Sequence, residues 1–128
     1  MNPYYYQTVF TLSDEDRQSL PGRFAVITAY NPRGLHAPES RNRHQDQALR
    51  AVLEARGIQP QRVIGSHPTK AHQEPGWGAA LTLRDALQIG RTFKQLAIYY
   101  VEDDLLKLCS CVGDEVVELG SFRERIQP

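Results

Sequence analysis

Short apolar runs alternate with polar, turn-forming segments along this chain, and their spacing predicts a mixture of strands and helices. The runs typical of buried strands are residues 24–30, 62–66, 77–82 and 96–101. Between them, residues 40–56 and 83–93 place apolar side chains three and four positions apart, which is typical of amphipathic helices. The predicted order is therefore strand, helix, strand, strand, helix, strand.

This order is the split βαβ pattern of ferredoxin-like folds. Because 128 residues is an ordinary length for one domain, we expect residues 1–128 to form a single α+β domain with a ferredoxin-like core. Residues 105–111 and 115–119 follow the core and predict a C-terminal β-hairpin extension. A small open sheet with a different strand order is the alternative.

Three segments are predicted to lie outside this core. Residues 4–10 indicate a short N-terminal strand or an extended arm. Residues 13–22 contain serine, aspartate and a Pro-Gly pair, which are typical of turns. Residues 120–128 are expected to form a tail that frays from residue 123 onward.

The first predicted helix, residues 40–56, has a mixed inward face. Its apolar stripe consists of Leu49, Val52 and Leu53, and Gly57 stands where a C-terminal cap belongs. Continued toward the N-terminus, the same stripe passes through Gln45 or Asp46 and then through Asn42. An ordinary amphipathic helix stays apolar on that face, so the first turns of this helix are expected to bury polar groups.

Two residues define the second predicted helix, residues 83–93. Thr82 is a suitable N-cap because its hydroxyl can accept a hydrogen bond from a free backbone N–H. Gly90 lowers helix propensity, and close packing of the helix against the sheet explains its presence there.

The balance of basic and acidic residues bears on whether the protein binds nucleic acid. The chain has 15 Lys and Arg against 15 Asp and Glu, so its formal net charge is zero. A protein that binds nucleic acid through its phosphates normally carries a clear positive excess. Extended nucleic-acid binding is therefore disfavoured.

Apolar run length and cysteine spacing indicate the compartment. The longest apolar run, residues 96–101, is far too short to cross a bilayer, and the N-terminus lacks the features of a signal peptide. Cys109 and Cys111 lie two apart in a predicted strand, which is poor geometry for a disulfide. We therefore expect a cytoplasmic protein with reduced cysteines and no membrane association.

The predicted topology gathers polar residues at one end of the sheet, the end at which strand 24–30 stops. The side chains of interest expected there are Asn31, Asn42, Arg43, His67, His72, Glu74, Arg91 and Gln95. Basic residues outnumber acidic ones at this end: Arg33, Arg41, Arg43, Lys70, Arg91 and Lys94 against Glu39, Asp46 and Glu74. A helix N-terminus beside arginines attracts anions.

Four short motifs resemble those of a bacterial family, the domain of unknown function 3293. They are Ile27-Thr28-Ala29-Tyr30-Asn31-Pro32, Asn42-Arg43, Glu74-Pro75 and Arg91-x-Phe93-x-Gln95-x-Ala97-Ile98. The resemblance covers residues 4–110 and implies recurring polar positions at Asn31, Asn42, Arg43, Glu74 and Gln95. It implies no particular activity. The family has an aromatic residue or a serine after Glu-Pro, where this chain has Gly76.

The first functional hypothesis is a binding module for a small anionic or nucleotide-like ligand, or for an acidic partner. Arg43 and Arg91 would supply the charge, and Asn31, Asn42 and Gln95 would orient the ligand through hydrogen bonds. Glu74 would be the partner of one of these arginines. Gln95 is equally suited to cap backbone carbonyls at the end of its helix.

Two alternatives remain open. A hydrolase or nuclease-like enzyme would use Glu74 as a base and His67 or His72 as an acid or a metal ligand. The spacing of these residues matches no strong metal motif, and neither a Gly-rich phosphate loop nor a nucleophile elbow occurs, so no cofactor is expected. The other alternative is a homo-oligomer assembled through residues 4–6 and the 105–119 hairpin.

Overall fold

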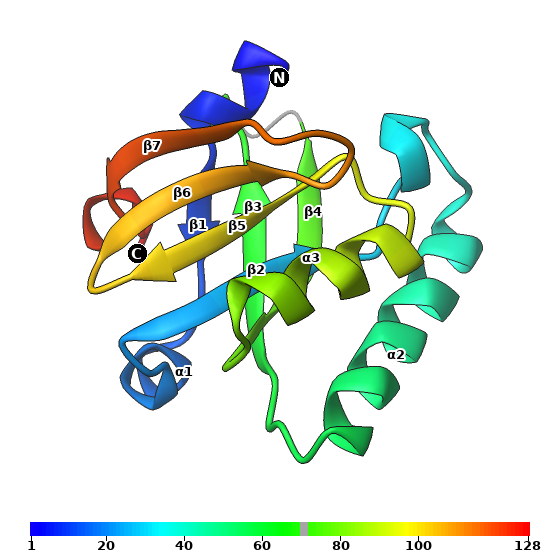
Figure 1. Ribbon diagram of the computed structural model, residues 1–128, viewed down its shortest axis with the longest axis horizontal. Helices are drawn as coiled ribbons and strands as arrows, with labels where there is room; N and C mark the ends of the chain where they lie inside the picture. Colours follow the sequence, from blue (N-terminus) through cyan, green and yellow to red (C-terminus); the bar gives the residue numbers. More distant parts are fainter. Residues whose placement is uncertain (70–71) are drawn as a thin grey trace.

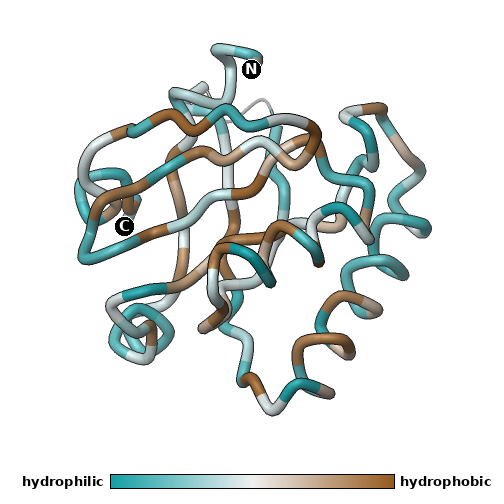
Figure 2. Tube along the Cα trace, viewed as in Figure 1, coloured by the Kyte–Doolittle hydropathy of each residue, from teal (hydrophilic) through white to brown (hydrophobic). Residues whose placement is uncertain are grey.

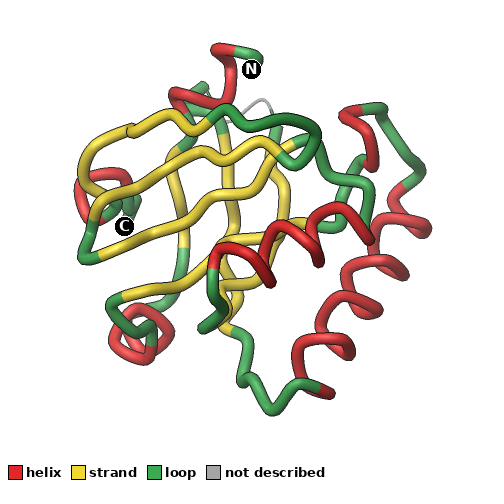
Figure 3. The backbone as a smooth tube through the Cα atoms, viewed as in Figure 1, coloured by secondary structure: helices red, strands yellow, loops and turns green. Residues whose placement is uncertain are grey.

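The computed structural model describes residues 1–69 and 72–128, which form an α+β domain built on one antiparallel sheet (Figures 1 and 3). The strands are β1 (Val9–Thr11), β2 (Arg23–Thr28), β3 (Gln61–Ser66), β4 (Gln73–Ala79), β5 (Ala97–Glu102), β6 (Leu105–Ser110) and β7 (Val116–Ser121). The α-helices are α1 (Asp14–Ser19), α2 (Glu39–Ala55) and α3 (Leu83–Thr92), and three short 3-10 helices are η1 (Pro3–Gln7), η2 (Pro32–Gly34) and η3 (Arg123–Arg125).

The strand order in the sheet is β1-β3-β4-β2-β5-β6-β7, and every neighbouring pair is antiparallel. Strand β4 lies between β2 and β3, as predicted from the sequence. The sheet curls into a half-barrel (Figure 1). The C-terminal segment returns to its first edge, where Ile126 bridges to Phe10 and the Gln127 N–H donates to the Phe10 carbonyl at 2.7 Å.

The two faces of the sheet are covered differently, because side chains alternate along each strand. Helices α2 and α3 cover the outer face, where Leu49 and Ile89 pack in one cluster with Ile27 of β2. On the inner face of the curl, Val26 packs with Phe122 and the other members of a second cluster. Figure 2 shows these apolar positions along the strands and along the sheet-facing side of α3.

Several local predictions for the helices are confirmed. The Thr82 hydroxyl caps α3 by accepting from the Asp85 N–H at 3.2 Å. Gly57 follows α2 with φ +78°, a left-handed conformation that glycine adopts without strain. A Cβ atom on Gly90 would lie 2.8 Å from Cys111 Sγ, so this glycine does permit close packing of α3 on the sheet.

Five local predictions are wrong. Residues 4–7 lie in the 3-10 helix η1 rather than in a strand or an extended arm, and the strand predicted at residues 77–82 is β4, which runs from Gln73 to Ala79. Residues 13–22 contain helix α1, because the Ser13 hydroxyl accepts from the Asp16 N–H at 3.0 Å and three acidic residues occupy the first turn. Val52 is 36% exposed and lies outside the buried stripe of α2. Residues 123–128 are not frayed, because the Arg125 guanidinium donates to the carbonyls of Tyr6 and Thr8 at 2.7 and 3.1 Å.

Within the described ranges 1–69 and 72–128, none of the helices combines the length and the apolar character needed to span a bilayer.

Candidate functional site

A network of buried amides joins the end of β2 to the start of α2. Asn31 follows β2 in a left-handed conformation, with φ 48°. Its backbone N–H donates to Asn42 Oδ1 at 2.9 Å, and Asn42 Nδ2 donates back to Asn31 Oδ1 at 3.0 Å. The Ala37 N–H donates to the same Asn31 oxygen at 3.0 Å. The polar first turn of α2 therefore holds the turn that ends β2.

Glu74, which lies on β4, is hydrogen-bonded to this network. Asn31 Nδ2 donates to Glu74 Oε2 at 3.1 Å, and His72 Nε2 lies 3.4 Å from the same oxygen. The Glu74 side chain is 26% exposed. Within residues 1–69 and 72–128, no arginine forms a salt bridge with Glu74, so the expected pairing with Arg43 or Arg91 is wrong.

A cavity of about 210 Å³ opens beside Glu74 on the inner face of the sheet. Five of the polar residues expected from the sequence line it, namely Asn31, His67, His72, Glu74 and Gln95. His36 is a further polar residue of the wall. Asn42 lies behind this wall and acts on it through Asn31.

The hollow exists because two strand positions on the inner face lack side chains. Gly65 of β3 pairs with Glu74, Gly76 of β4 pairs with Thr28, and all four line the cavity. A Cβ on Gly76 would lie 2.8 Å from the Ile27 carbonyl oxygen, so the backbone there leaves no room for one. A Cβ on Gly65 would meet Thr8 Cγ2 at an ordinary 3.5 Å and would project into the cavity.

Tyrosines form the aromatic wall. Helix η1 brings Tyr4 and Tyr5 to the cavity, and Tyr4 stacks on His67 with ring centroids 4.5 Å apart. Tyr99 of β5 donates from its hydroxyl to the Tyr5 carbonyl at 3.0 Å and lies 2.7 Å from Thr8 Oγ1. Burial raises the pKa of the Tyr99 hydroxyl, with a smaller contribution from Glu74. Burial and then Glu74 also raise the pKa of Tyr5.

Gln95 has the capping role that its position suggested, and it also lines the cavity. Its Nε2 donates to the carbonyls of Tyr30 at 3.2 Å and Phe93 at 3.3 Å, so it caps the backbone at the end of α3. The side chain is also part of the cavity wall. Two neighbouring carbonyls can be satisfied only by the NH₂ group, so the Gln95 amide orientation is determined and its Oε1 is directed elsewhere.

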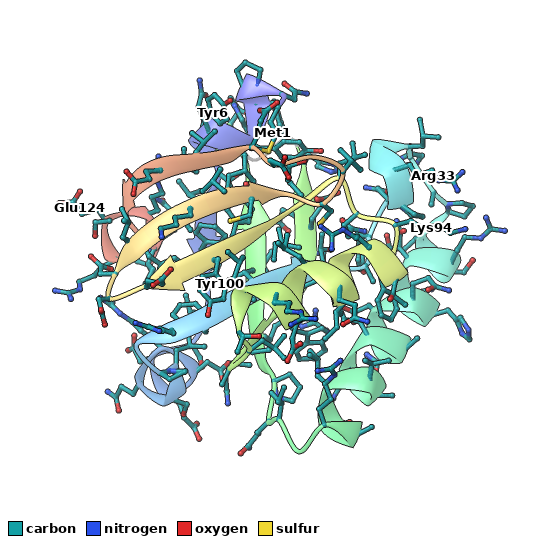
Figure 4. All side chains as sticks on the ribbon, in the orientation of Figure 1. Met1, Tyr6, Arg33, Lys94, Tyr100 and Glu124 are labelled. Atoms are coloured by element: carbon teal, nitrogen blue, oxygen red, sulfur yellow. The ribbon has the colours of Figure 1, made fainter. Side chains whose placement is uncertain are left out.

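The predicted cations do not join this cavity. Arg43 is exposed on α2, and the Arg91 Nε donates to the Cys111 carbonyl at 2.8 Å. Neither is among the residues that line the cavity. Arg33 and Lys94 are adjacent near this end of the sheet, since the Arg33 N–H donates to the Lys94 carbonyl at 2.7 Å (Figure 4). Lys70 lies outside the described residues.

The buried Asp46 of α2 has a structural partner that the sequence did not reveal. Arg62 of β3 binds both Asp46 carboxylate oxygens, at 2.9 and 2.7 Å, and its guanidinium lies 3.6 Å from the centre of the Trp77 ring. The Trp77 Nε1–H donates to the Asp46 carbonyl at 3.2 Å. This cluster lies on the face of the sheet that the helices cover, and its polar groups bind one another.

His67 and His72 have different hydrogen-bond partners. His67 ring nitrogens lie 2.9 Å from Thr69 Oγ1 and 3.1 Å from Gln7 Oε1, whereas His72 is paired with Glu74. Among the residues that the structure describes, no three His, Cys, Asp or Glu side chains gather in a way that could hold a metal ion. The metal-dependent form of the enzyme hypothesis therefore gains no support from their placement.

Sequence reasoning missed part of the cavity. Tyr99, Thr8 and Gly65 were not singled out, although a glycine inside a strand is a known sign of a bulge or of close approach by a ligand. Tyr99 lies in a strand that also contributes Ile98, Tyr100 and Val101 to the core, and no local pattern marks which face of a curled sheet is hollow.

The chain belongs to a family described as proteins of unknown function, DUF3293, whose model matches residues 27–98. This confirms the resemblance noted from its motifs. Searches of curated proteins and of solved structures found no match.

Proposed function

We propose that this DUF3293 protein is a binding module and that its ligand is a small polar molecule held in the cavity on the inner face of the sheet. One observation carries the proposal: Asn31, Glu74 and Gln95, which are far apart in the sequence, line the same cavity. Ligand sites are typically concave, with aromatic walls and a few convergent polar groups, and the three tyrosines and these polar side chains fit that description.

The size of the cavity limits the ligand. Its volume of about 210 Å³ is below the roughly 300–1,000 Å³ of sites for drug-sized ligands. A whole nucleotide is therefore less well accommodated than a small metabolite. An anionic ligand also has less support than it had from the sequence, because Arg43 and Arg91 lie outside the cavity wall.

A hydrolytic enzyme is the second candidate, and the His72–Glu74 pair favours it. These side chains lie 3.4 Å apart at the edge of the cavity, and Asn31 orients the carboxylate. A base held by a second group is a common catalytic arrangement. Turnover of small ester or amide substrates that is abolished by His72→Ala would favour this candidate over simple binding.

We further propose that β2, α2, β3, β4, α3 and β5 constitute a ferredoxin-like core inside the larger curled sheet. The strand order β3-β4-β2-β5 and the packing of both helices in one cluster support this description. A cytoplasmic location is proposed on the free, buried thiols of Cys109 and Cys111.

The binding proposal is tested by a thermal-shift screen of small polar metabolites with the wild-type chain and two cavity-filling variants, Gly65→Ala and Gly65→Val. Ile64→Val is the matched control, because residue 64 precedes Gly65 in β3 and its side chain points to the other face. We expect ligand-induced stabilisation in the wild type and in Ile64→Val, a smaller shift in Gly65→Ala and none in Gly65→Val. Equal shifts in all four proteins would contradict binding in this cavity.

A further inference from the structure

The described residues that line the cavity include one with a full formal charge, and that charge is negative. Among the described residues that line it, Glu74 is the sole Asp, Glu, Lys or Arg. Its influence extends across the cavity, since Glu74 contributes to raising the pKa of both Tyr5 and Tyr99 after the larger effect of burial. Arg125 lowers the pKa of Tyr99 by less than Glu74 raises it. Among the described lining residues, the one full charge that a ligand would meet is therefore the Glu74 carboxylate.

Two acceptor atoms of the polar wall have no hydrogen bond within the described residues. Glu74 Oε2 is occupied by Asn31 and His72, whereas Oε1 accepts no hydrogen bond within the described residues. Gln95 donates both of its bonds through Nε2, and its Oε1 likewise accepts none from the described residues. Asn31 contributes no free acceptor, because its oxygen accepts from Ala37 and Asn42, while its Nδ2 donates to Glu74.

Contacts within the protein hold both of these side chains. Glu74 is held by the Asn31 side chain, and Gln95 is held by the carbonyl of the preceding residue, Tyr30. The side-chain amides of Asn31 and Gln95 each have a determined orientation. Asn31 Oδ1 already accepts the Ala37 N–H, and the Gln95 amide faces two carbonyls. The free oxygens are therefore fixed by contacts that do not depend on a ligand.

From this arrangement we infer that the ligand is a small organic cation with N–H donors, a primary amine or a guanidinium compound, whose charged end binds Glu74. The inference rests on the proposed binding function and adds the class of ligand. A cationic N–H donor satisfies a carboxylate and an amide oxygen together, and tyrosine rings attract cations through their faces. An anion of the same size would meet an unneutralised carboxylate.

The test is isothermal titration calorimetry at pH 8. The probes are 1,4-diaminobutane and agmatine as cations, butan-1-ol as a neutral analogue, and butyrate and inorganic phosphate as anions. We expect saturable binding of a cation, at least tenfold weaker in Glu74→Gln and absent in Gly65→Val. Arg43→Ala, which changes an exposed charge outside the cavity, should bind like the wild type.

The outcomes separate the two proposals. Binding of butan-1-ol, butyrate or phosphate that is lost in Gly65→Val, without binding of either cation, would overturn the cationic ligand and leave the binding module standing. Cation binding that Glu74→Gln leaves unchanged would also overturn the assignment to Glu74. Cation binding that survives in Gly65→Val but is lost in Glu74→Gln would instead overturn the cavity as its location.

Discussion

Asn31 and Asn42 bind each other reciprocally. The Asn31 backbone N–H donates to the Asn42 side-chain oxygen at 2.9 Å, and the Asn42 side-chain nitrogen donates to the Asn31 side-chain oxygen at 3.0 Å. Both residues are buried. The pair fixes a left-handed turn directly after β2, and it thereby positions the Asn31 Nδ2 group that holds Glu74 at the cavity.

Replacing Asn42 by alanine should destabilise the fold. The substitution leaves the buried Asn31 N–H without its acceptor, which costs about 1–3 kcal/mol for an unsatisfied buried group. Urea unfolding followed by circular dichroism measures this loss. The matched control is Arg43→Ala at the next, exposed position of α2, which should stay within about 0.5 kcal/mol of the wild type. Equal stability of the two variants would show that the amide pair is dispensable.

Replacing Glu74 by glutamine should change stability little. A large loss would follow if Glu74 neutralised a buried arginine, but its contacts are with Asn31 and His72. Glutamine retains an oxygen for the Asn31 Nδ2 group, so the cost is the difference between a charged and a neutral acceptor, about 1 kcal/mol. The melting temperature measures it, and a severe loss would mean that the carboxylate has a structural role beyond these contacts.

Replacing Gly90 by alanine should destabilise the protein although alanine is the better helix former. The added Cβ would lie 2.8 Å from both Cys111 Sγ and Ile98 Cγ2, and overpacking of this kind costs about 1–3 kcal/mol. That cost exceeds the gain of about 1 kcal/mol in helix propensity. Gln88→Ala, at an exposed position of the same helix, provides the control. Denaturant midpoints compare the two, and a more stable Gly90→Ala protein would contradict the close packing.

Replacing Arg125 by alanine should loosen both ends of the chain. Its guanidinium donates to the carbonyls of Tyr6, Thr8 and Leu119, which links the N-terminal segment to β7. Loss of hydrogen bonds to a charged group costs about 1.5–3 kcal/mol. Hydrogen exchange should accelerate at the amides of β1 and of the C-terminal segment. Arg123→Ala, an exposed neighbour, should leave both exchange and stability unchanged.

Local chemistry accounts for the features that could be predicted from the sequence. The helix limits at Thr82 and Gly57, the tight contact at Gly90 and the buried polar stripe through Asn42 and Asp46 all follow from periodicity and from the properties of single residues. The order of strands and helices brought Asn31, Glu74 and Gln95 to one end. The short helix α1 was missed because its capping serine and acidic first turn are equally typical of turns.

The sequence by itself thus determined the order of the main strands and of the two longer helices, the antiparallel placement of β4 between its neighbours and the end of the sheet at which polar groups meet. Only the tertiary structure decided that a cavity opens on the inner face, that tyrosines from η1 and β5 enclose it, and that Arg62 rather than a ligand neutralises Asp46. These features depend on the curl of the sheet and on contacts such as Tyr99 with Tyr5, whose partners are 94 positions apart. Periodicity and capping act over a few residues, so they contain no information about which distant side chains the curl brings together.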